Sequence, residues 1–295
     1  MTKGKIIKAL SGFYYVQVAD RVIECRGRGL FRKKNITPLV GDRVDIELQD
    51  DGSGYLTKIE KRDNELIRPP IANVQQAFIV TSAVDPVFNA QLLDRFLVLV
   101  EAEQIEPVLI ITKMDLIDEN EKHEIERFRR TYHQIGYPVL LVSAKGKEGI
   151  DDIIPYMKGK TTVMAGQSGV GKSTLLNELK PGLNLETKGI SKSLGRGKHT
   201  TRHVELLEMH GGLIADTPGF SSLEFENIDA DELQHFFPEM RDKHSQCKFR
   251  GCRHHQEPKC AVKEAVEKEE IASFRYQHYL QFLQEIQNRK PRYER

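Results

Sequence analysis

The sequence predicts three modules in one chain: a small closed β-barrel, a central α/β domain and a mainly helical C-terminal module. Short alternating segments fill the first sixty-odd residues, apolar runs then alternate with helical patterns, and helical spacing dominates the rest. A chain of 295 residues with 39 % hydrophobic content has room for a sizeable core and small additional modules. We place the modules at residues 1–66, 67–225 and 226–295.

Short segments with alternating or β-branched residues predict the strands of the N-terminal module, and Gly- and Asp-rich turns separate them. Five strands in so short a length are typical of an OB-fold barrel. The basic loop at residues 26–34 is either a solvated hairpin tip or a contact for the phosphate backbone of RNA. The predicted strands are residues 4–10, 13–19, 22–25, 43–48 and 55–61.

The central domain starts after Arg68-Pro69-Pro70, which favours an extended linker. Helical patterns cover residues 90–103 and 119–135, and apolar runs lie between them. Strands that alternate with helices predict a mostly parallel sheet covered on both faces.

A glycine-rich loop follows the apolar run 161–165 and precedes a helical stretch. In this context backbone N–H groups can surround phosphate groups. Lys172 would neutralise the β- and γ-phosphate oxygens of a nucleotide and so act in catalysis, and Ser173 would bind Mg2+. The residues assigned here to nucleotide binding are Gly166, Gln167, Ser168, Gly169, Val170, Gly171, Lys172, Ser173 and Thr174.

A second phosphate-side motif follows the apolar run 212–215: Asp216-Thr217-Pro218-Gly219. At the end of a strand, the carboxylate of Asp216 can reach the Mg2+ shell through water, and the N–H of Gly219 can contact the γ-phosphate. The motif alone is more often an ordinary turn, but its place after a strand and beyond a phosphate loop favours the nucleotide.

Base selection is predicted upstream, in Thr112-Lys113-Met114-Asp115 and Ser143-Ala144-Lys145. Asp115 could accept hydrogen bonds from the N1–H and amino groups of guanine, which adenine cannot donate. Lys113 would lay its methylene stem over the base, and the N–H of Ala144 would lie near the guanine carbonyl oxygen. Thr112 stands where such motifs usually carry Asn, which predicts a modest affinity for guanine.

The order of these motifs is unusual, because base recognition follows the phosphate loop in an ordinary GTPase and precedes it here. The sequence therefore predicts a circularly permuted P-loop GTPase domain with GTP as substrate, GDP as product and Mg2+ as cofactor.

A cluster of metal-binding residue types lies in the C-terminal module: Cys247, Cys252, His254 and Cys260. Three thiolates and one imidazole suit a tetrahedral Zn2+ site, and four protein ligands predict a structural role. Free thiols or an iron–sulfur centre are the alternatives, and His255 rivals His254 as the fourth ligand. Cys25 is interpreted as a small buried apolar residue.

The net charge of +1 means that any contact with nucleic acid must come from local patches. No run of about 18 apolar residues exists and the N-terminus has no apolar signal core, so we expect a cytoplasmic protein without membrane contact.

Together, the barrel, the permuted motifs, the segment 197–201, Asp-Thr-Pro-Gly-Phe at 216–220 and the Cys/His module resemble the bacterial ribosome-small-subunit-dependent GTPases. These are circularly permuted GTPases of 30S ribosomal subunit biogenesis. The resemblance covers essentially the whole chain. It implies slow GTP hydrolysis stimulated by the 30S subunit, binding to 16S rRNA near the decoding region, and late maturation with release of another assembly factor. We expect a monomer.

The group that positions the attacking water is the least determined part of the site. Phe220 stands where many GTPases place a Gln. The resemblance suggests His199, beside Thr201, and the alternative is a histidine without a catalytic role. We assign Thr201 rather than Thr200 to Mg2+ because Thr-Arg resembles the switch sequence of related assembly GTPases.

We hypothesise that the nucleotide state reorients the metal-bearing module relative to the barrel. Two other functions stay open: a nucleotide-gated RNA-binding scaffold with little turnover, and a GTPase serving another RNA process such as tRNA modification.

Overall fold

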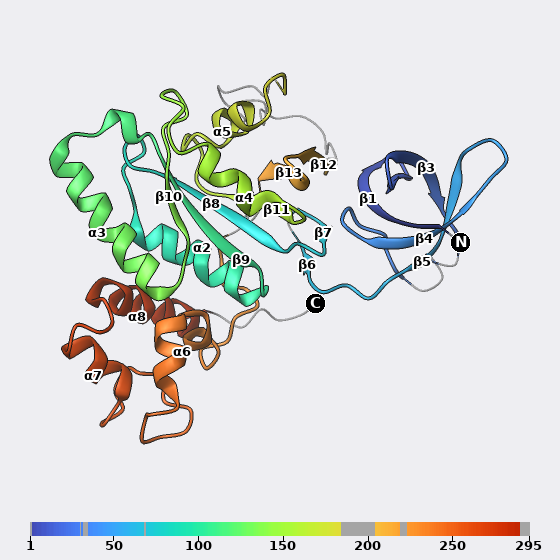
Figure 1. The fold of residues 1–295 in the computed structure, drawn as a ribbon. Coiled ribbons are helices and arrows are strands. Elements are labelled where there is room, and N and C mark those ends of the chain that lie inside the picture. Colours follow the sequence, from blue (N-terminus) through green and yellow to red (C-terminus); the bar gives the residue numbers. More distant parts are fainter. Residues whose placement is uncertain are drawn as a thin grey trace.

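The structure, a computed structural model, describes residues 2–29, 31, 35–67, 69–183, 204–218 and 223–289, with only the backbone described at 216–218. The predicted multidomain architecture is confirmed: a closed barrel, a central sheet with helices and a helical C-terminal module follow one another along the chain (Figure 1).

The N-terminal barrel closes in the strand order β1-β2-β3-β5-β4. Strands β3 and β5 pair parallel and the other pairs are antiparallel. Alternation along the strands buries Ile6, Val16, Ile46 and Leu56 completely, as a barrel interior requires. The strands are β1 (Thr2–Leu10), β2 (Phe13–Val18), β3 (Arg21–Gly27), β4 (Arg43–Leu48) and β5 (Gly54–Ile59).

A short antiparallel pair, β6 (Glu65–Leu66) and β7 (Ile71–Ala72), leads from the barrel into the central domain. The central sheet has the order β10-β9-β8-β11-β13-β12, and only the edge strand β12 runs antiparallel to its neighbour. The strands are β8 (Gln76–Ser82), β9 (Glu106–Thr112), β10 (Val139–Leu141), β11 (Thr161–Ala165), β12 (Leu206–Met209) and β13 (Gly212–Pro218).

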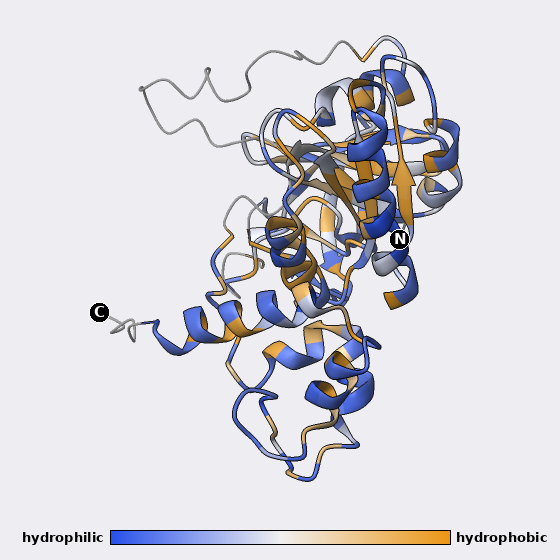
Figure 2. Cartoon of the chain, turned by 90° about the vertical axis from the view of Figure 1, so that its left-hand side faces the viewer, coloured by the Kyte–Doolittle hydropathy of each residue, from blue (hydrophilic) through white to orange (hydrophobic). Residues whose placement is uncertain are grey.

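Helices cover both faces of this sheet. Ala77 and Ile79 of β8 face a core built with α2 (Ala90–Ala102) and α3 (Glu119–Ile135). Phe78 and Val80 face a second core with α4 (Ile154–Met157) and α5 (Lys172–Leu179). The alternate residues of one strand thus enter two cores, which is why β8 reads as a continuous apolar run. Figure 2 shows apolar strands between helices whose outer faces are hydrophilic.

The C-terminal module contains η3 (Leu233–Phe236), α6 (Pro238–His244), α7 (Ala261–Glu267) and α8 (Ser273–Gln287), and it packs below α2 and α3 in Figure 1. Among the described helices, none combines the length and the apolar character needed to cross a membrane.

A buried ionic network joins this module to the central domain. The carboxylate of Asp94 in α2 accepts hydrogen bonds from Arg275 Nη1 and Tyr132 Oη and lies against His278 Nδ1, each at 2.6 Å. Arg275 also binds Glu239 of α6 at 2.7 and 3.1 Å, and both Asp94 and Arg275 are fully buried. Removing one partner of such a pair costs about 3–5 kcal/mol, because it leaves an uncompensated buried charge. The network therefore fixes the metal-bearing module on α2.

Candidate nucleotide-binding site and candidate metal centre

The predicted nucleotide motifs meet at one edge of the central sheet. Strands β8, β9, β10, β11 and β13 are parallel, so their carboxyl ends share an edge, where α/β sheets bind ligands. The phosphate loop connects β11 to α5. Gly166 has a φ of +136°, and a Cβ there would lie 2.1 Å from the carbonyl oxygen of Val80, so this position requires glycine.

Lys172, the first residue of α5, points back into the phosphate loop. Its ammonium donates hydrogen bonds to the carbonyl oxygens of Gly166 and Gln167, both at 2.7 Å. Burial lowers the pKa of Lys172 to about 8. Ser173 and Thr174 follow in the first turn of the same helix, which leaves Gln167, Ser168 and Gly169 as the exposed part of the loop.

The guanine-selecting residues lie on the neighbouring strand ends. Asp115 is exposed in η1 (Met114–Leu116), and its Oδ1 accepts a 2.6 Å hydrogen bond from the hydroxyl of the buried Ser143. That hydroxyl in turn accepts from the N–H of Gly146 at 2.9 Å. The two predicted base motifs are thus brought into direct contact, and Ser143 orients the carboxylate of Asp115. Ala144 and Lys145 continue the same loop.

Lys113 is held by the loop that contains Asp85. The residue has a φ of +62°, and its ammonium donates to the carbonyl oxygen of Asp85 in the loop after β8. The sequence carries no recognisable motif in that loop. The contact arises because β8 and β9 pair in parallel, which brings the loops after both strands to the same edge of the sheet.

Thr112 is 2 % exposed, and its hydroxyl lies 2.5 Å from the carbonyl oxygen of Val170 and 3.1 Å from that of Thr81. The side chain therefore contacts the backbone of the phosphate loop, although its place in the motif predicted a contact with the nucleotide. Its hydroxyl ties the end of β9 to the loop.

We predict that Thr112→Val, which keeps the shape and removes the donor, weakens GDP binding about three- to tenfold, because the Val170 carbonyl loses its partner. Thr112→Ser keeps the hydroxyl and should bind as the wild type does. Calorimetric titration with GDP measures both, and an unchanged affinity of Thr112→Val would contradict the tether.

For several residues predicted to lie in the nucleotide site, the structure does not describe the side chain. The backbone of Asp216 lies in β13, which pairs parallel with β11 and so reaches the same edge as Gly166. His199, Thr200, Thr201 and Gly219 lie outside the described residues.

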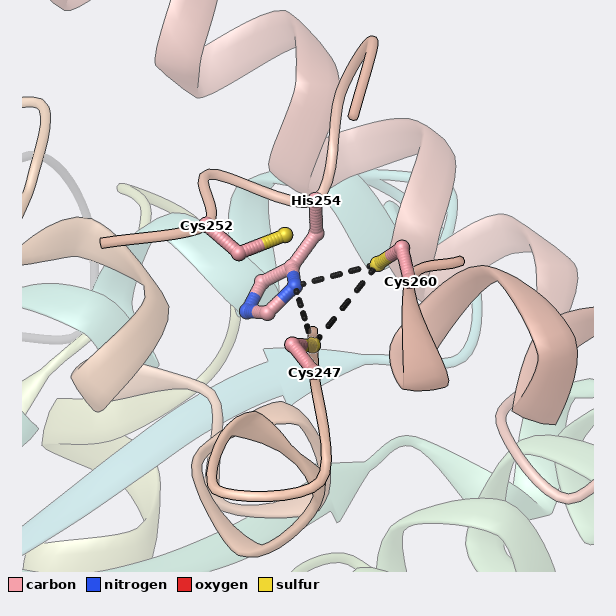
Figure 3. A group of neighbouring side chains, drawn as sticks. All are labelled: Cys247, Cys252, His254 and Cys260. Atoms are coloured by element: carbon pink, nitrogen blue, oxygen red, sulfur yellow. Dashed lines mark hydrogen bonds between the residues drawn. The ribbon is translucent and has the colours of Figure 1, made fainter. Parts of the chain in front are cut away.

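The structure brings Cys247, Cys252, His254 and Cys260 together, with all four ligand atoms within 4.8 Å of one another (Figure 3). The Nδ1 atom of His254 lies 3.3 Å from Cys260 Sγ and 3.6 Å from Cys247 Sγ, and the two sulfurs are 4.0 Å apart. Tetrahedral Zn2+ with Zn–S bonds of about 2.3 Å separates its sulfurs by about 3.8 Å. The donor set and its spacing therefore fit a zinc ion.

His254 is fully buried in this cluster, whereas His255 is exposed. Burial lowers the pKa of His254 to about 4, which keeps the imidazole neutral as a metal ligand must be. Burial raises the pKa of Cys252 to about 12, so a cation is needed to favour its thiolate.

Two tyrosines of α8 donate hydrogen bonds to the loop that carries the metal cluster. The hydroxyl of Tyr276 donates to the carbonyl oxygen of His254 at 2.6 Å, and that of Tyr279 to the carbonyl oxygen of Arg253 at 2.7 Å. On the far side of the ring, Nε2 of His254 lies 3.4 Å from Nδ1 of His244. These contacts set the orientation of the imidazole. The fourth cysteine, Cys25, is buried in the barrel.

Two family models match this chain, and both describe the same family. The model of the RsgA GTPase matches residues 59–226, and that of the RsgA N-terminal domain matches residues 3–56. Two curated relatives are the small ribosomal subunit biogenesis GTPase RsgA 2 of Oceanobacillus iheyensis, 61 % identical, and RsgA of Bacillus subtilis, 59 % identical. Each alignment covers 99 % of this chain and 100 % of the relative.

Solved structures agree over nearly the full length. The circularly permuted GTPase YloQ is 55 % identical with a TM-score of 0.88, covering 99 % of this chain and 97 % of that one. YjeQ from Thermotoga maritima is 39 % identical with a TM-score of 0.89, covering 98 % and 99 %. With its motifs, permuted order and fold in agreement, the chain belongs to the RsgA GTPase family.

Proposed function

We propose that this GTPase acts in late maturation of the 30S ribosomal subunit, binds 16S rRNA, and hydrolyses GTP faster when the 30S subunit is bound. The observation that carries the proposal is the contact between Asp115 and Ser143 beside the phosphate loop, in a chain with a barrel at one end and a Cys/His cluster at the other. The names of its relatives support the ribosomal role. A role in ribosome assembly implies that the protein acts in the cytoplasm, and we propose that it acts as a monomer.

The nucleotide site would bind GTP with these residues in separate roles. Lys172 neutralises the β- and γ-phosphate oxygens, and Ser173, Thr201 and Asp216 hold Mg2+ directly or through water. Bound Mg2+ supplies charge neutralisation at the phosphates. His199 orients the attacking water, since the chain has Phe220 where many GTPases have a Gln. The cluster around His254 holds one Zn2+ in a structural role.

The barrel offers a surface suited to single-stranded RNA. Phe13, Arg26 and Tyr55 are cross-strand neighbours on β2, β3 and β5, so their side chains share one outer face. The Arg26 guanidinium lies over the Phe13 ring, 4.9 Å from its centroid. A cation between two aromatic rings can stack on bases and neutralise phosphate. Phe31 of the basic loop is 7 % exposed and contributes to the core instead.

GTP turnover with 30S, 50S and 70S particles at matched salt tests the proposal. We expect stimulation by the 30S subunit alone. Absence of stimulation by any particle would favour the nucleotide-gated RNA-binding scaffold, and Arg26→Ala should then still lower RNA affinity. Stimulation by another RNA would point to a different RNA process.

A further inference from the structure

The loop after β8 carries the carbonyl group that holds Lys113. The ammonium of Lys113 donates a hydrogen bond to the carbonyl oxygen of Asp85, while the stem of this lysine is expected to lie over guanine. A Cβ placed on Gly169 of the phosphate loop would lie 3.8 Å from Cδ of Pro86, so the two loops are neighbours. The loop after β8 is therefore next to both the base side and the phosphate side of the nucleotide site.

The backbone of Asp85 needs support from its surroundings. Its φ is +49°, in the left-handed region that favours glycine. The hydroxyl of Ser82 donates to the carbonyl oxygen of Pro86 at 2.7 Å. The N–H of Phe88 donates to the carbonyl oxygen of Ala83 at 3.3 Å. These bonds close the loop around Asp85, so the residues at the ends of the loop determine where its carbonyl group points.

Phe88 ties the end of this loop to α3. Its ring packs on that of Phe128, with ring centroids 4.8 Å apart, and Phe128 packs on Phe274 of α8 at 5.3 Å. All three rings are half-buried and pack against the apolar core. Because Phe88 is three residues from Asp85, loss of its ring would loosen the Asp85 carbonyl as well.

We propose that Phe88 is a positioning residue for guanine-nucleotide binding, which holds the Asp85 carbonyl where the ammonium of Lys113 reaches it. The stem of Lys113 is then in place before the nucleotide arrives, which lowers the ordering cost of binding. Phe88 itself need not touch the nucleotide, and no element has to move. The inference rests on the nucleotide site of the proposed function and not on the ribosome.

Titration with GDP tests this role. Phe88→Ala should weaken binding about three- to tenfold, the range that corresponds to the loss of one aromatic pair. Its kcat should stay within about twofold, because no group at the phosphates is changed. Phe88→Tyr keeps the ring and should bind as the wild type does. Phe274→Ala is the matched control: it removes a half-buried ring of the same row, leaves the contact of Phe88 with Phe128, and should bind within about twofold of the wild type.

A double-mutant cycle with Lys113 separates positioning from a general loss of stability. Lys113→Met keeps the stem and removes the ammonium, so the position of the Asp85 carbonyl no longer affects it. In that background, Phe88→Ala should cost less than about twofold in GDP affinity. A loss that persists there overturns the proposal, and so does wild-type affinity of Phe88→Ala. If thermal unfolding shows that Phe88→Ala does not fold, Phe88→Leu replaces it in the cycle with the same expectation.

Lys113→Met alone tests the nucleotide site. Its GDP affinity should fall at least about threefold, because the stem loses its anchor. Unchanged affinity would remove Lys113 from the site, and the inference about Phe88 would fail with that assignment. Weaker binding by Lys113→Met together with unchanged binding by Phe88→Ala would leave the site standing and overturn only the role of Phe88.

Discussion

Replacing Lys172 with methionine should lower kcat/KM for GTP by about 10²- to 10³-fold, because the phosphates lose the half-buried cation that points into the phosphate loop. Methionine keeps the length and the apolar stem. GTP turnover and GDP titration measure the change, and thermal unfolding serves as the control for folding. A variant with wild-type turnover would exclude Lys172 from the site.

The pH dependence of nucleotide binding gives a second check on the same residue. With a pKa of about 8, Lys172 loses its proton at higher pH, so GDP affinity should fall up to about tenfold per pH unit above 8. The pH dependence of folding stability has the opposite sign. Between pH 8 and 10.5, the ordinary pKa of lysine, Lys172 binds more protons in the unfolded chain than in the folded one. Its contribution to the free energy of unfolding therefore rises over this window. Weaker binding there would not be a sign of unfolding, and Lys172→Met should lack the pH dependence.

Cys260→Ser should abolish zinc binding and unfold the loop around the metal cluster. Structural Zn2+ in small finger peptides contributes roughly 10–16 kcal/mol of binding free energy at pH 7, which is folding free energy when no site exists in the unfolded chain. We expect loss of zinc by elemental analysis and rapid proteolysis between Cys247 and Cys260. A chelator should have the same effect on the wild type.

Cys25→Ala is the matched control, because Cys25 is also fully buried but lies in the barrel. Burial raises the pKa of its thiol to about 11, so it stays protonated. This variant should keep full zinc content. Full zinc content in Cys260→Ser would remove that residue from the ligand set.

Local sequence was sufficient to predict the parts of the fold that rest on backbone geometry. The loop from Gly166 to Ser173 could be recognised because its glycines and lysine follow an apolar strand, and Gly166 indeed needs a left-handed φ. The Cys/His cluster was predictable from spacing because its ligands lie within fourteen residues, from 247 to 260.

Contacts between distant segments could not be predicted in this way. Arg275 and Asp94 are 181 residues apart, and each reads in the sequence as one more charged residue on an amphipathic helix. The direction of the Thr112 hydroxyl depends on the neighbouring strand and loop, so the motif suggested the nucleotide where the structure places backbone. The choice between His254 and His255 likewise required the fold, which buries one ring and exposes the other.

The buried pair of Asp94 and Arg275 restricts how the metal-bearing module can reorient relative to the barrel. Because Asp94 and Arg275 fix that module on α2, the central domain has to move with it. The barrel meets the central domain through polar pairs, such as Lys8 with Glu205 at 2.9 Å and Lys5 with the buried Thr161 at 2.9 Å. The barrel core also belongs to the same buried apolar cluster as Ala77 and Ile79 of β8, so a reorientation at this joint would have to separate apolar as well as polar contacts.

The distance in sequence between Asp94 and Arg275 also bears on how the protein is made. Helix α8 is the last described helix to be synthesised, whereas α2 is complete once residue 102 of the 295 has been added. Until α8 has been synthesised, Asp94 cannot pair with Arg275, and its carboxylate has to stay hydrated. The face of the central domain formed by α2 and α3 therefore closes only after α8 has left the ribosome. A factor for ribosome assembly would thus complete this face late in its own synthesis.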